Sequence, residues 1–122
     1  MAKREKVGLS HLTPVEAKAV RAFVDRVNAH LPGVATRFIL FGSKARGESH
    51  AGSDIDILVL VRGDDWRTNN AISTLAARIS LEQDVLLGPV IIDQERWEQM
   101  GREKFSLYRN ATREGVVIPL SA

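Results

Sequence analysis

The amino-acid sequence predicts an α/β (α+β) domain in which a small sheet is backed by helices. The length of 122 residues suits one domain, and a content of 44% apolar and 26% charged residues is typical of a globular chain. Some segments place apolar residues at helical spacing, and others are short β-branched runs. The two kinds of segment alternate along the chain, which favours a sheet with helices packed against it.

The first expected element is a helix that begins after Thr13 and ends at Pro32-Gly33. Thr13 can cap this helix, Pro14 suits its first position, and Glu16 completes a capping box. Its inward stripe consists of Val20, Phe23, Val24, Val27 and Leu31. Residues 34–41 then predict a buried strand, because they are apolar and β-branched and end at a glycine.

Residues 42–52 are expected to form a loop with a short helical turn around Lys44-Ala45-Arg46, and residues 54–61 a second strand. Asp64 or Asp65 can cap the next helix. The inward positions of that helix are Ile72, Leu75, Ala76 and Ile79. Residues 84–92 predict a third strand, in which Gly88-Pro89 indicates an edge position or a bulge.

The last third of the chain predicts two helices and a short end. Asp93 can cap a short helix that contains Trp97, and residues 102–114 predict another helix with Gly115 as its C-cap. Residues 116–118 are apolar and predict a short strand or an extended end. We therefore expect residues 1–122 to form a single domain.

Composition excludes several classes of function. The absence of cysteine excludes disulfides, zinc–thiolate sites and thiol nucleophiles, and the three histidines lack metal-ligand spacing. A net charge of +2 is too weak to predict nucleic-acid binding, and the one tight basic run, residues 3–6, is expected to be a solubilising tail. With neither a signal peptide nor an apolar run of about 20 residues, we expect a cytoplasmic protein that does not enter a membrane.

The strongest chemical signal is the pair Asp54 and Asp56 at the start of the second expected strand. Residues two apart in a strand point to the same face, so both carboxylates can converge on one cation. Hard oxygen ligands favour Mg²⁺ or Mn²⁺. Asp-x-Asp alone also fits a solvent-exposed strand end, and the preceding loop decides between these two interpretations.

That loop begins with Gly42-Ser43, directly after a buried strand. A glycine lets the backbone approach a phosphate, and successive N–H groups can bind an anion. The Ser43 hydroxyl adds a donor, while Lys44 and Arg46 add positive charge. The loop is not a Walker A motif, because the order and spacing of its Lys and Ser differ. The sequence thus places phosphate donors next to metal-binding carboxylates.

The two segments together resemble the nucleotidyltransferase superfamily that includes DNA polymerase β, and within it the minimal nucleotidyltransferases. The matching residues are Gly42-Ser43-Lys44-Ala45-Arg46-Gly47 and Gly52-Ser53-Asp54-Ile55-Asp56-Ile57-Leu58-Val59. Tyr108-Arg109-Asn110 and Arg113-Glu114-Gly115-Val116 are similar to the C-terminal end of stand-alone members. The resemblance implies a polymerase-β-like fold, with a small mixed sheet of about three to four strands flanked by helices.

The resemblance also implies residue roles. Gly42, Ser43 and Ser53 would contact the nucleotide, and Asp54 and Asp56 would be catalytic residues that bind Mg²⁺ (or Mn²⁺) with ATP as substrate. Arg46 would contact phosphate or form a structural salt bridge. Family members carry a third carboxylate on the next strand, and Asp84 is the candidate for this catalytic, metal-binding position. If Asp84 does not reach the pair, binding of nucleotide and metal is better supported than turnover.

Stand-alone minimal members commonly pair with a helical HEPN protein, and some act as antitoxins that transfer AMP onto it. The resemblance therefore implies a HEPN-type protein partner, homodimerisation, or both. A catalytically degenerate relative that neutralises its partner by binding alone is the alternative. Trp66, Trp97 and Tyr108 are candidates for an interface or for internal packing.

Overall fold

The computed structural model describes residues 11–48, 53–63 and 65–120. The basic run 3–6, the loop segment 49–52 and Asp64 lie outside these residues. The elements in chain order are α2 (Pro14–His30), β1 (Ala35–Phe41), α3 (Ser43–Arg46), β2 (Ile55–Val61), α4 (Trp66–Gln83), β3 (Leu87–Asp93), α5 (Gln94–Arg102), α6 (Ser106–Glu114) and β4 (Val116–Ile118).

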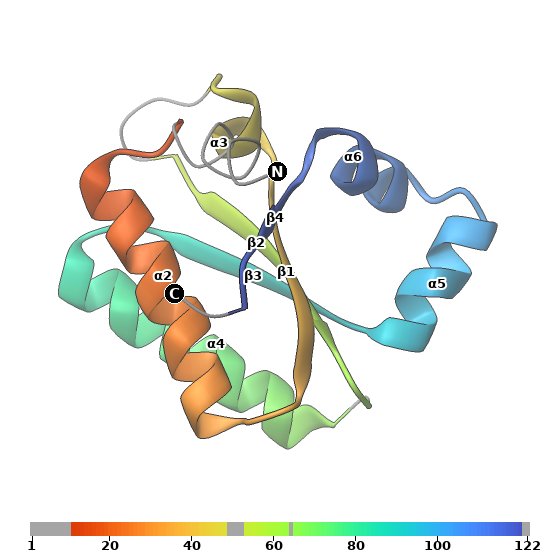
Figure 1. Cartoon of the computed structure of the whole chain (residues 1–122), viewed down its shortest axis with the longest axis horizontal. Helices are drawn as coiled ribbons and strands as arrows, with labels where there is room; N and C mark the ends of the chain where they lie inside the picture. The colour runs from red at the N-terminus through yellow and green to blue at the C-terminus, as the bar shows by residue number, and fades with distance from the viewer. Residues whose placement is uncertain (1–10, 49–52, 64, 121–122) are drawn as a thin grey trace.

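The sheet is mixed, with the strand order β3-β2-β1-β4. β1 runs antiparallel to both β2 and β4, whereas β2 and β3 are parallel. Figure 1 shows α2 and α4 on one side of this sheet and α5 and α6 on the other, with α3 at one end. The expected α/β class and small mixed sheet are confirmed.

Side-chain alternation along β2 explains why the sheet is covered on both faces. Ile55, Ile57, Val59 and Val61 lie in the core shared with α2 and α4. Leu58 and Leu60 lie in the second core, with residues of α5 and α6. Asp56 has the same parity as these leucines, so it belongs to the face that α5 and α6 cover further along the strand.

Local sequence signals place the helix starts. Thr13 and Glu16 form the expected capping box, with Glu16 N donating to Thr13 Oγ1 at 3.1 Å and Thr13 N to Glu16 Oε1 at 2.9 Å. Asp65 caps α4 by accepting from Arg67 N at 2.9 Å. Asp93 caps α5 by accepting from Glu95 N at 3.1 Å.

β3 is an edge strand, as Gly88-Pro89 indicated. Ile55 N donates to Leu86 O at 2.7 Å, so even-numbered residues of β3 direct their backbone groups toward β2. Pro89 therefore faces the open edge, where its missing N–H leaves no ladder bond unmade and weakens pairing with another strand.

Two elements start more than one residue away from their predicted positions. The third strand begins at Leu87 and not at Asp84, because α4 extends to Gln83 and Asp84 is its C-cap in the left-handed region. The helix expected over residues 102–114 begins only at Ser106, because Lys104 has a φ of 59° and separates α5 from α6. Among the described residues, every helix is too short or too polar to cross a membrane.

Candidate active site

The turn between β1 and α3 forms the first part of the site. Gly42 has φ 76° and ψ −158°, a backbone conformation that is essentially restricted to glycine. Its carbonyl accepts hydrogen bonds from Ala45 N at 3.1 Å and Arg46 N at 3.2 Å, which closes the short helix α3. Gly47, with φ 76° and ψ 20°, ends that helix. Ser43 therefore occupies the first helical position, where its own N–H has no partner within the helix.

Asp56 lies directly beside this turn, at the start of β2. It pairs with Phe41 of β1 and with Gly88 of β3. A Cβ on Gly42 would lie 2.4 Å from Asp56 Oδ2, and a Cβ on Gly88 would lie 3.6 Å from Asp56 Oδ1. The carboxylate is therefore flanked by two glycines, and the first of them has no room for a side chain.

Electrostatics at Asp56 favour a bound cation. Burial first, and the neighbouring Asp54 charge second, raise the pKa of the Asp56 carboxyl, while Arg46 opposes the shift. Asp54 is exposed just ahead of β2 and Asp56 is half-buried. Two adjacent carboxylates that repel each other are stabilised by a divalent cation, and Mg²⁺ commonly binds one or two carboxylates together with phosphate oxygens. The oxygen donors of Asp54 and Asp56 fit this ion.

Lys44 has a different environment from the one expected for a phosphate ligand. Its side chain is 3% exposed, and its Nζ lies 2.5 Å from Glu16 Oε2 of α2. Its positive charge is thus bound inside the fold. Burial raises the pKa of the Glu16 carboxyl, but hydrogen bonds from Lys44 and Thr13 outweigh this and the pKa is lowered overall.

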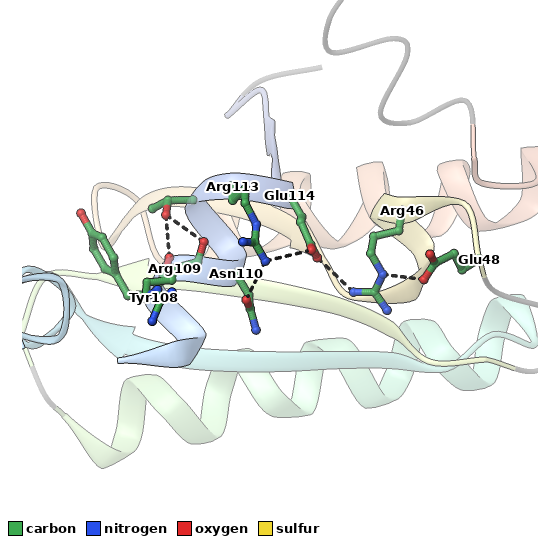
Figure 2. A network of polar contacts seen from close by, with 8 residues as sticks. Arg46, Glu48, Tyr108, Arg109, Asn110, Arg113 and Glu114 are labelled. Carbon is green, nitrogen blue, oxygen red and sulfur yellow. Dashed lines mark hydrogen bonds and ion pairs between the residues drawn. The ribbon is translucent and has the colours of Figure 1, made fainter. Parts of the chain in front are cut away.

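Arg46 forms the salt bridges that were one of its two expected roles. Its Nε lies 2.7 Å from Glu48 Oε1, and its Nη1 lies 3.1 Å from Glu114 Oε2 at the end of α6. Figure 2 shows Arg46 between these two carboxylates, with Arg113 on the far side of Glu114. Arg46 also lies close enough to Asp56 to lower its pKa.

Asp84 is not part of the carboxylate pair. Within residues 11–48, 53–63 and 65–120, no three His, Cys, Asp or Glu side chains gather closely enough to hold a metal ion. Asp84 instead lines a cavity of about 570 Å³, together with Thr13, Val15, Glu16, Ser53, Val85 and Leu86. Its placement at the head of the third strand was wrong, although it shares this cavity with Ser53, the residue before Asp54.

The sequence did not predict the roles that three residues have in the site: Glu16, Gly88 and Glu114. Glu16 was assigned only to a helix cap, and Gly88 only to a strand irregularity. Glu114 lies 68 positions from its partner Arg46. Local patterns give no signal for such pairings, although the acidic residue in Arg113-Glu114-Gly115 was part of the C-terminal resemblance.

Comparisons with known proteins give a consistent result. Residues 20–117 match the profile of the nucleotidyltransferase domain family. A Methanocaldococcus jannaschii protein named as a protein adenylyltransferase is 32% identical over 104 residues, which cover 84% of this chain and 97% of the relative. A second protein of that name from the same organism is 36% identical over 73 residues, which cover 59% of this chain and 74% of the relative.

Solved structures share the fold. A structure described as a minimal nucleotidyltransferase is 25% identical with a TM-score of 0.54, and the match covers 88% of this chain and 97% of that one. A mutant of the toxin–antitoxin pair MntA–HpeT includes a chain that is 23% identical with a TM-score of 0.51, covering 79% and 68% of the two chains.

Proposed function

The chain belongs to the nucleotidyltransferase domain family, and we propose that it transfers AMP from ATP to a partner protein in a reaction that depends on Mg²⁺ or Mn²⁺. One observation carries the proposal: the Asp56 carboxylate lies against Gly42, so close that a Cβ on Gly42 would lie 2.4 Å from Asp56 Oδ2. A group that binds phosphate at the turn would therefore meet a cation bound at the carboxylates.

Each part of the site has a role in this proposal. The backbone of Gly42 and Ser43 and the Ser43 hydroxyl bind the β- and γ-phosphates, and Ser53 and Arg46 contact the nucleotide or order its binding loop. Asp54 and Asp56 hold the metal. When bound, Mg²⁺ supplies charge neutralisation at the phosphate oxygens. The acceptor attacks the α-phosphorus in line and pyrophosphate leaves, so the protein contributes chiefly by positioning the reacting groups.

We assign the cavity beside Ser53 to the acceptor side of the reaction. It extends from the start of α2 to Asp84 and Leu86, and Ser53, the residue before Asp54, lines it. Asp84 is then a residue that faces the acceptor and can accept its proton, in place of a metal ligand. Asp84 therefore keeps a proposed catalytic role, but it acts on the acceptor and does not bind the metal.

The names of the relatives support AMP as the transferred group and a protein as the acceptor. The fold likeness to one chain of a toxin–antitoxin pair extends the proposal to an antitoxin with a HEPN-type helical toxin as partner. The resemblance to stand-alone members also implies homodimerisation.

AMP transfer is tested with the co-expressed partner, ATP labelled at the α-phosphate, and Mg²⁺. We expect label in the partner, and loss of that label in Asp54→Ala and Asp56→Ala. Asp25→Ala is the matched control, because Asp25 is an exposed aspartate on α2. No labelling by the wild type, or equal labelling by all variants, would contradict the proposal.

A specific observation also favours the alternative of a binding-only antitoxin. The strand position beside Asp56 is Gly88, so β3 contributes no carboxylate there. If the chain acts by binding alone, the Asp54→Ala/Asp56→Ala double variant still forms the complex and still protects cells from the partner. Loss of protection in the double variant, with the complex intact, excludes this alternative.

A further inference from the structure

The short helix α3 lies between two helices from opposite ends of the chain, and each of its charged side chains binds one of them. Lys44 pairs with Glu16 of α2 at 2.5 Å, and Arg46 pairs with Glu114 of α6 at 3.1 Å. Ala45, between them, is buried in the main core. Figure 1 shows α3 at the top of the view, with the start of α2 on its left and α6 on its right.

We propose that Glu16 and Glu114 are positioning residues, which hold α3 from two sides and so fix the orientation of the Gly42-Ser43 turn. The importance of that turn rests on the proposed function, since it is the turn that would bind the triphosphate. The two ion pairs themselves do not depend on that function, and they can be tested separately.

The turn needs such support because α3 cannot hold itself in place. It has four residues, and a helix of one turn is unstable without tertiary contacts. Gly42 and Gly47, at its two ends, both have a φ of 76°. Glycine gives these positions conformational freedom in the unfolded chain, so the ordered direction of α3 must come from its neighbours.

On the α2 side, Glu16 is itself fixed. Its Oε1 accepts from Thr13 N at 2.9 Å in the helix cap, and its Oε2 faces Lys44. The Lys44 side chain is 3% exposed and that of Glu16 is 12% exposed. Removing one partner of a buried pair leaves the other charge without compensation, so this contact strongly favours one arrangement of α3.

On the α6 side, Glu114 is held by the packing of the residue that follows it. A Cβ on Gly115 would lie 2.5 Å from Ile39 Cγ2 of β1, so the end of α6 contacts the sheet directly. Gly115 N donates to Ala111 O at 2.9 Å, and β4 begins at Val116 and pairs with β1. Arg46 therefore binds a carboxylate whose backbone is anchored to the sheet.

The matched pair Glu114→Gln and Glu48→Gln tests the α6 contact. Each variant removes one carboxylate from Arg46, but only Glu114 joins α3 to another element, since Glu48 belongs to the same loop. Hydrogen exchange of the Ala45, Arg46 and Glu48 amides reports opening of α3, because these amides bond to Gly42 O and Ser43 O. For Glu114→Gln we expect exchange about two- to fivefold faster and a similar weakening of Mg·ATP binding.

For Glu48→Gln we expect less than about a twofold change in either measurement. Equal effects of the two variants, or no effect of Glu114→Gln, would overturn the proposal. Tighter binding of Mg·ATP to Glu114→Gln would also overturn it, because Glu114 would then compete with the triphosphate for Arg46. If the wild type does not bind ATP, the proposed function fails, and the exchange rates still decide whether Glu114 orders α3.

Glu16→Gln tests the α2 contact. Hydrogen exchange is measured below the melting temperature of this variant. We expect faster exchange of the same three amides by about tenfold or more, since the Glu16–Lys44 pair is buried. Glu82→Gln, which breaks the exposed pair between Arg26 and Glu82, is the control for loss of an α2 ion pair. If Glu16→Gln is not folded, the Glu114→Gln result alone decides the proposal; exchange equal to that of Glu82→Gln would contradict it.

Discussion

Replacement of Gly42 by alanine separates backbone strain from damage to the site. Gly42 has a φ of 76°, and an added Cβ would lie 2.4 Å from Asp56 Oδ2 and 3.3 Å from Asp56 Cγ. The Asp56 side chain can rotate away, so the steric conflict is relieved by moving the proposed metal ligand. The backbone strain of about 1–3 kcal/mol remains.

Gly33→Ala is the matched control, because Gly33 has a φ of 77° and nothing lies within 4 Å of its added Cβ. Both variants should lose about 1–3 kcal/mol of stability, measured by denaturant unfolding. Only Gly42→Ala should also weaken Mg·ATP binding, by about 10- to 100-fold in calorimetry, as happens when the orientation of a metal ligand is lost. If Gly42→Ala binds Mg·ATP within about twofold of Gly33→Ala, the contact between Gly42 and Asp56 does not orient a metal ligand.

Three further predictions concern the carboxylates. Burial and then Asp54 raise the pKa of the Asp56 carboxyl in the folded protein. Ionisation of Asp56 therefore lowers the stability of the folded state as the pH rises. Without metal, Asp56→Asn should melt at a higher temperature than wild type at pH 7. This difference should vanish below the ordinary pKa of aspartate, and a pH-independent difference would contradict the cause given. Gly88→Asp adds a carboxylate beside Asp56, at a position where an added Cβ would lie 3.6 Å from Asp56 Oδ1. This variant should tighten Mg²⁺ binding by about three- to tenfold in calorimetry, and unchanged affinity would count against a metal at Asp56. Asp84→Asn keeps a residue type that tolerates the left-handed backbone conformation at this helix C-cap. This variant should keep the Kd for Mg·ATP within about twofold of the wild-type value and should lower the rate of AMP transfer. Weaker Mg·ATP binding would instead identify Asp84 as a metal ligand.

Local chemistry explains what could be predicted from the sequence. The capping box of Thr13 and Glu16 and the side-chain alternation in β2 depend on neighbours a few residues apart. Gly42-Ser43 and Asp54-Ile55-Asp56 are continuous segments, and the antiparallel pairing of β1 with β2 brings them together. The fold class and the core of the candidate site could therefore be derived before the structure.

Long-range packing determined the rest. Lysine is a residue type that usually lies at the surface, and Lys44 is buried only because α2 packs beside it and places Glu16 against it. Asp84 was assigned to a strand because an apolar run follows it, but α4 extends further and places it in the turn that ends the helix. Local sequence patterns also could not predict that β3 runs parallel to β2. This parallel pairing places Gly88 beside Asp56.

We propose that Asp54, Asp56 and the Gly42-Ser43 turn bind a metal–triphosphate together. Calorimetric titration of ATP in Mg²⁺ and in EDTA, on the wild type and on the Asp54→Ala/Asp56→Ala variant, tests it most directly. We predict binding only by the wild type in Mg²⁺. Binding that persists in EDTA or in the double variant, or no binding by the wild type, would show that these residues do not form a shared metal–triphosphate site.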